Sequence, residues 1–90
     1  MVEDWKRRLR RAGLPGAAKV ELTWRFAAQE TAFELRSLDV SGAVIGDDRD
    51  YDLLKAVMSP LENLAEMSGI ASGRAVLWLE TDRLDGPSAA

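Results

Sequence analysis

The densest group of chemically active side chains is a basic cluster near the beginning of the sequence. Within six positions stand Lys6, Arg7, Arg8, Arg10 and Arg11. Guanidinium groups this close together could neutralise the phosphates of RNA or DNA, or bind an anionic membrane or another acidic partner. The sequence pI of about 4.9 argues against nucleic acid, because domains that bind it usually have a pI above about 9. We therefore favour a solvated helix face and keep nucleic-acid binding by this basic helix as the alternative function.

A second candidate is a run of aspartates at alternate positions, Asp48, Asp50 and Asp52. This spacing resembles the first ligands of a calcium-binding loop. Such a loop needs glycine at its sixth position and glutamate at its twelfth, where this sequence has Leu53 and Ser59. We therefore predict that the aspartates cap the beginning of a helix, where negative charge is favourable.

The segment 68–74, with Gly69 and Gly73, superficially resembles a phosphate-binding loop. In that loop the glycines lead from a strand into a helix. Here they follow a predicted helix and precede a predicted strand, so we expect Gly69 to end the helix and a turn to follow.

The residues that are missing exclude most catalytic chemistry. The chain has no cysteine and no histidine, which removes disulfides, thiolate–metal sites, thiol nucleophiles and imidazole acid–base catalysis. Tyr51 and Lys55 share a helix face, but this spacing is common in solvated helices. We expect no enzymatic activity, no metal and no cofactor. A third and weaker alternative is an enzyme built at a subunit interface around a metal or a small molecule.

The first half of the chain predicts one helix and a hairpin. Val2, Trp5, Leu9 and Ala12 recur at helical spacing, which indicates a short amphipathic helix. Residues 19–26 alternate between apolar and polar side chains, as a half-buried strand does, and residues 31–40 alternate less cleanly. We predict a hairpin of these two segments, with a helix over 27–38 as the competing interpretation. Residues 41–49 are expected to form turns and loop.

The second half predicts helix and then strand. Asp50 can cap a helix, and the segment Ser59–Glu62 has the form of a capping box with proline at the first helical position. The pattern therefore indicates one kinked helix or two abutting ones, ending at Ser68–Gly69. Residues 74–81 form the last predicted strand, which is apolar on both faces.

Together these elements predict an α+β fold in one small domain of residues 1–81. A three-stranded, mainly antiparallel sheet, made of the hairpin and the C-terminal strand, is packed by the kinked helix or helix pair. Residues 82–90 are expected to be a flexible tail. A three-stranded sheet leaves two open edges, which proteins must pair or cover, so we expect an oligomer.

The tryptophans divide between core and surface. Trp24 belongs to the apolar face of the first strand and is expected in the core. Trp78 and Val76 lie on the face of the last strand opposite Ala75, Leu77 and Leu79. We slightly favour the core for Trp78, with a subunit interface as the alternative, because tryptophan is enriched there.

The sequence thus favours a small, non-enzymatic protein-interaction or oligomerisation module. The expected partner is a second copy, with a dimer favoured, or another protein. The residues proposed to make contact are Trp78, Val76, Trp5, Arg7, Arg8, Arg10 and Arg11. No apolar run is long enough to span a bilayer and no signal peptide is evident, so we expect the cytoplasm. The threefold excess of arginine over lysine suggests a GC-rich bacterial genome.

Overall fold

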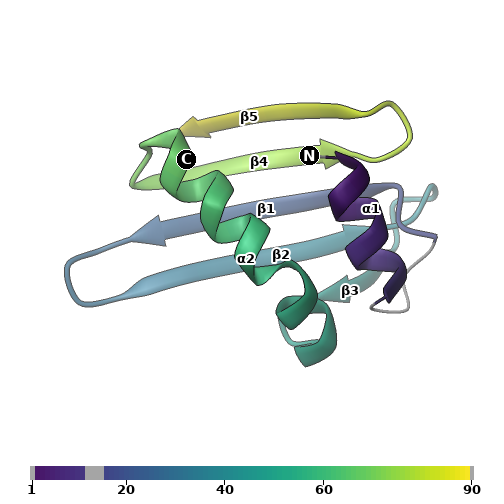
Figure 1. The fold of residues 1–90 in the computed structure, drawn as a ribbon, viewed down its shortest axis with the longest axis horizontal. Helices are drawn as coiled ribbons and strands as arrows, with labels where there is room; N and C mark the ends of the chain where they lie inside the picture. Colours follow the sequence, from purple (N-terminus) through teal and green to yellow (C-terminus); the bar gives the residue numbers. More distant parts are fainter. Residues whose placement is uncertain (1, 12–15, 90) are drawn as a thin grey trace.

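The computed structural model describes residues 2–11 and 16–89. It contains α1 (Val2–Arg11), β1 (Lys19–Phe26), β2 (Thr31–Leu38), β3 (Val44–Asp47), α2 (Tyr51–Ser68), β4 (Ser72–Trp78) and β5 (Arg83–Ala89). The strands form one antiparallel sheet in the order β3-β2-β1-β4-β5, and both helices lie on the same face of it (Figure 1). The predicted α+β class is confirmed, but the sheet has five strands instead of three.

The central strand β1 determines which side chains face the helices. Val20, Leu22 and Trp24 are buried, whereas the residues between them are partly or fully exposed, so the predicted alternation is confirmed. β2 pairs with β1 along its whole length, which excludes the helix considered for 27–38. Ala27 and Glu30 close the hairpin through two backbone hydrogen bonds, and the hairpin extends beyond the helices (Figure 1).

Two predictions about irregular segments are wrong. Part of the expected loop 41–49 is β3, which pairs with β2, and the expected tail after Asp82 contains β5, which pairs with β4. Neither strand has a clear alternation of its own, and β5 contains Gly86 and Pro87, residues that usually mark turns. Both strands form because the preceding strand offers unpaired backbone groups, and the side-chain pattern of β3 and β5 does not encode this pairing.

The new edge strands change the argument about assembly. β3 has only four residues, and β5 contains a proline and the charged residues Arg83 and Asp85. Short edge strands, charge and proline all discourage pairing with another chain. The open edges that favoured an oligomer in a three-stranded sheet are therefore no longer an argument for one.

Helix α2 runs without interruption from Tyr51 to Ser68. Asp50 caps it as predicted, because its carboxylate accepts a hydrogen bond from the backbone N–H of Leu53, and Gly69 ends it in the left-handed conformation. Pro60 lies inside the helix and does not begin a second one, so the predicted capping box is not used.

A single apolar core fills the space between the helices and the sheet. Trp5 and Leu9 of α1 contribute to it, together with one face of α2 and the buried sides of β1, β2 and β4. The predicted stripe of α1 is confirmed for these two residues, while Ala12 lies outside the described residues. Trp24 is in the core as expected, and its indole N–H donates to the carbonyl of Ile70. Neither helix of the described ranges is long and apolar enough to cross a membrane.

Candidate interaction surface

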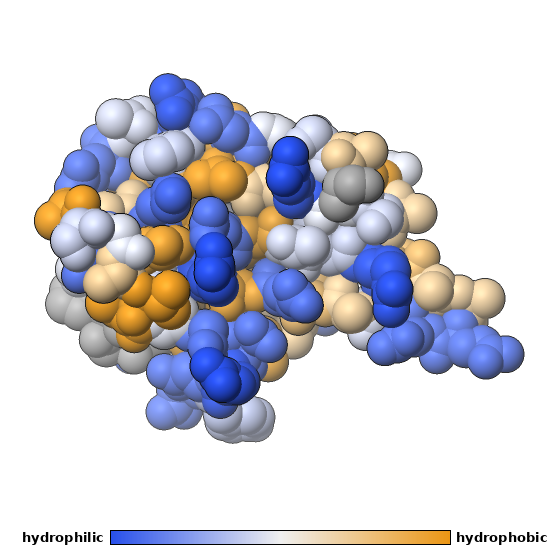
Figure 2. Space-filling model, turned by 180° about the vertical axis from the view of Figure 1, so that it is seen from behind, coloured by the Kyte–Doolittle hydropathy of each residue, from blue (hydrophilic) through white to orange (hydrophobic). Residues whose placement is uncertain are grey.

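The face of the sheet that points away from the helices is not covered by any described element. Figure 2 views it from behind, and it presents hydrophilic and apolar side chains that alternate without forming one continuous apolar patch. The side chains that reach this face come from the positions of β1, β2 and β4 between the core residues, and from β5 beside them. Trp78 and Val76 point outward and lie on this face. The prediction that Trp78 belongs to the core is therefore wrong.

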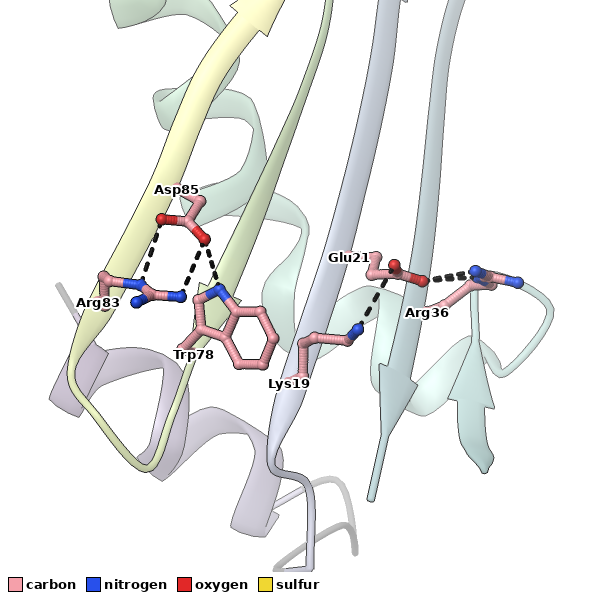
Figure 3. Close-up of polar contacts among 6 residues, drawn as sticks. All are labelled: Lys19, Glu21, Arg36, Trp78, Arg83 and Asp85. Carbon is pink, nitrogen blue, oxygen red and sulfur yellow. Dashed lines mark hydrogen bonds and ion pairs between the residues drawn. The ribbon is translucent and has the colours of Figure 1, made fainter. Parts of the chain in front are cut away.

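Trp78 is held in place by its neighbours on both sides. Its cross-strand partners are Lys19 on β1 and Arg83 on β5. The Lys19 ammonium lies 5.0 Å and the Arg83 guanidinium 5.2 Å from the ring centroid, within the range of a cation–π interaction. The indole N–H donates to Asp85 over 2.7 Å, and Asp85 also accepts from Arg83 (Figure 3). Each contact restricts the ring, so Trp78 presents a preorganised surface.

A second charged group lies beside the first on the same face. Glu21 accepts from the Arg36 guanidinium on β2 and lies 3.9 Å from the Lys19 ammonium (Figure 3). Val76 lies between the two acidic side chains, because it is registered with Glu21 on one side and with Asp85 on the other. Trp78 and Val76 therefore form a short apolar strip on β4 with charged side chains of both signs around it.

The face contains a shallow hollow of about 580 Å³ between β2 and β5. Glu21, Arg36, Arg74, Val76 and Asp85 are among the residues that line it. Two of the three carboxylates that line it, Glu21 and Asp85, already accept hydrogen bonds from arginine or tryptophan. An apolar strip with fixed charges around it can bind a complementary surface.

The basic cluster of α1 is largely engaged within the molecule. Asp4 pairs with Arg7 at 2.8 Å and with Arg8 at 2.9 Å, and these arginines hold the pKa of its carboxyl below the usual value of 3.8. The Arg8 guanidinium also donates to the backbone of α2. Arg10 and Arg11 are exposed, and neither forms an ion pair with a residue in 2–11 or 16–89. Two of the four predicted arginines, Arg7 and Arg8, are therefore engaged within the molecule, and Arg8 connects α1 to α2.

Trp5, the remaining predicted contact residue, is 1 % exposed and belongs to the core. It packs at the junction of α1 and α2, so a partner cannot reach its ring without opening the helix pair. The Trp78 and Val76 positions of β4 are thus separated from Trp5 by the full thickness of the sheet.

The aspartates around the start of α2 serve local structure. Asp50 is the helix cap, and Asp47 accepts from both the backbone and the side chain of Arg49, which lowers its pKa below 3.8. Within the described ranges, no group of three or more acidic side chains is arranged to hold a metal ion.

Five residues of the candidate surface were not proposed as contact residues from the sequence: Lys19, Glu21, Arg36, Arg83 and Asp85. The alternation of β1 places Lys19 and Glu21 on the same face, so these two were within reach of sequence reasoning. Arg83 and Asp85 were not, because their segment was expected to be a flexible tail. Comparison with protein-family models, with curated proteins and with solved structures finds no match to this chain.

Proposed function

We propose that this protein is a non-enzymatic interaction module that assembles with a second copy through the uncovered face of its sheet. The observation that carries the proposal is the position of Val76 and of Trp78, the last residue of β4, on a sheet face that neither helix covers. Tryptophan is among the residues enriched at the energetically important positions of protein interfaces, and burying its ring removes about 150–250 Å² from water.

The charges around these residues favour a protein surface over a nucleic acid. The face holds the acidic Glu21, Glu34 and Asp85 among its cations, and carboxylates repel phosphates. Single-stranded nucleic acids also need a free aromatic face on which a base can stack. Lys19 and Arg83 both lie over the Trp78 ring, so a base would first have to displace one of them.

The size of the face suggests a weak assembly. Five strands about 4.8 Å apart, each contributing about seven residues of about 3.3 Å, give a footprint of about 550 Å². Two such faces bury about 1,100 Å², which is at the low end for specific interfaces. We therefore expect a dissociation constant in the range of about 10–100 μM, since small interfaces of this kind are typically transient.

The test is the molar mass in solution as a function of concentration. Sedimentation equilibrium from about 5 to about 500 μM, a range that brackets such an affinity, should show a monomer–dimer equilibrium for the natural sequence. Val76→Lys should abolish it, because a charged side chain would enter the apolar strip. The fold should tolerate this change, because the new ammonium lies between Glu21 and Asp85.

Met67→Lys is the matched control. Met67 is an apolar side chain, 88 % exposed, on the helix side of the molecule, so its replacement introduces the same charge away from the proposed interface. A monomer throughout the concentration range would overturn the proposal. So would an assembly that persists in Val76→Lys but disappears in Met67→Lys.

A further inference from the structure

The uncovered face contains two neighbouring rows of side chains with opposite character. The strand register aligns the members of the first row, Lys19, Trp78 and Arg83. The second row lies two residues further along each strand and consists of Glu21, Val76 and Asp85. On β1 and on β5, the cation of the first row therefore has an anion beside it in the second row. On β4, the aromatic ring of Trp78 has the aliphatic side chain of Val76 beside it.

This pattern is complementary to itself under a two-fold rotation. An axis that lies in the plane of the face, between the rows and perpendicular to the strands, exchanges the two rows. It would place Lys19 of one copy opposite Glu21 of the other, Trp78 opposite Val76, and Arg83 opposite Asp85. An interface between identical copies related by such an axis uses the same patch on both.

We infer that the occupant of the uncovered face is a second copy of this chain, paired row against row by this two-fold axis. The inference rests on the proposed function and adds the register and the residues that determine it. The two cations and two anions of the six residues cancel, so the patches do not repel each other although each chain has a net charge of −3.

Charge selects this register over a direct superposition of equal rows. A two-fold axis along β4 would instead face each row with its own copy, so Lys19 would meet Arg83 and Glu21 would meet Asp85, and like charges at an interface are strongly unfavourable. Rotation by the axis between the rows replaces every like pair by an opposite pair. The existing contacts within one copy, Lys19 with Glu21 and Arg83 with Asp85, hold each charge ready for its second partner.

Two other cations flank the six residues of these rows. Arg36 continues the second row onto β2, where Asp47 is its registered neighbour, and Arg74 is registered with Ser88 in the next row. Packed sheets cross at about 30° because strands twist, so contact concentrates at the centre of the paired patches and weakens toward the flanking positions. We therefore assign specificity to the six residues of the two rows.

The experiment mixes charge-reversed variants of the full chain. Lys19→Glu places carboxylates opposite each other in a homodimer, and Glu21→Lys places ammonium groups opposite each other, so each variant alone should dimerise at least about tenfold more weakly. Mixed in equal amounts, they should form a heterodimer of about the natural affinity, because every reversed charge then faces its opposite. Native mass spectrometry distinguishes the heterodimer from both homodimers by mass.

The control mixture is Lys19→Glu with Asp85→Lys. It has the same net charges as the first mixture, but in the inferred register the reversed positions do not face each other. The carboxylate introduced by Lys19→Glu would still meet Glu21 of the other copy, and the ammonium introduced by Asp85→Lys would meet Arg83, so no rescue is expected. Far-ultraviolet circular dichroism and thermal unfolding of each variant confirm that the monomers are folded.

Equal rescue by both mixtures, or rescue by neither, would overturn the inferred register. If Val76→Lys abolishes assembly in that case, the uncovered face remains the interface and only the pairing is wrong. If Val76→Lys leaves assembly intact, or the natural chain is monomeric, the proposed function itself fails together with the inference.

Discussion

The guanidinium of Arg8 in α1 donates a hydrogen bond of 2.9 Å to the backbone carbonyl of Ala56 in α2. That carbonyl would normally accept from the N–H four residues later in the helix. The residue there is Pro60, which has no N–H. Arg8 therefore supplies the donor that the proline lacks. Asp4 orients the Arg8 guanidinium by accepting a hydrogen bond from its Nε. This contact explains how a proline is accommodated in the middle of α2.

We predict that Arg8→Ala lowers the free energy of unfolding by about 1 kcal/mol, because a hydrogen bond from a charged group is lost at a partly exposed site. In a Pro60→Ala background the new N–H satisfies Ala56, so the same change should cost about 0.5–1 kcal/mol less. Urea unfolding of the four proteins measures this coupling. Arg7→Ala, which loses only a surface pair with Asp4, is the control, and equal costs of Arg8→Ala in both backgrounds would contradict the assignment.

Gly73 allows close contact between β4 and the core. It is registered opposite Trp24, and a Cβ at this position would lie 2.7 Å from a ring carbon of that tryptophan. Trp24 cannot easily move, because it is buried and bonded to the Ile70 carbonyl. We expect Gly73→Ala to destabilise the fold by about 1–3 kcal/mol, as overpacked cores do. Thermal unfolding measures the change.

Gly16→Ala is the matched control for this prediction, since nothing lies within 4 Å of its added Cβ. The cost of Gly73→Ala should also fall in a Trp24→Phe background, where the contacted ring atom is absent. An unchanged cost there would show that the strain has another origin.

We predict that the carboxyl group of Asp39 contributes to the acid sensitivity of the fold. The Ser41 hydroxyl and then the backbone N–H of Ala43 donate to its carboxylate and lower its pKa below 3.8. Because the folded pKa is depressed, the contribution to stability is complete above about pH 4, near the unfolded pKa, and is lost as the pH falls through the folded value. An NMR titration of the carboxyl group should give a value below 3.8.

Ser41→Ala removes the largest cause of this shift. The pKa of Asp39 should rise toward its ordinary value in this variant, so the loss of stability that this group causes on acidification should be smaller and should be complete at a higher pH. A titration of Asp39 that is the same in both proteins would refute the role of the Ser41 hydroxyl.

The alternative function, nucleic-acid binding, now depends on Arg10 and Arg11. Replacing the whole basic cluster would also disturb Asp4 and the Arg8 contact with α2, so a combined Arg10→Ala and Arg11→Ala variant is the appropriate probe. We expect the natural chain to leave the anisotropy of labelled single-stranded RNA unchanged up to about 10 μM protein at about 50 mM salt, where electrostatic binding is strong. Binding that falls with salt and disappears in the double variant would instead establish the alternative.

Local patterns determined the elements whose apolar residues repeat with a regular period. The helical spacing of Trp5 and Leu9, the alternation of β1 and the cap at Asp50 each arise from neighbours in the sequence, and all three agree with the structure. These patterns were enough for the α+β class, because burial of one face of a helix or strand requires a periodic sequence.

Only the tertiary structure decided the identity of β3 and β5, the position of Pro60 inside one helix, and the surface around Trp78. Each depends on a partner in another element: β2 for Asp47, Arg8 for the Ala56 carbonyl, and β5 for the ring of Trp78. Hydrogen bonds and ion pairs of this kind have no period along the chain. They become visible only when the sheet brings Lys19, Trp78 and Arg83 into one row.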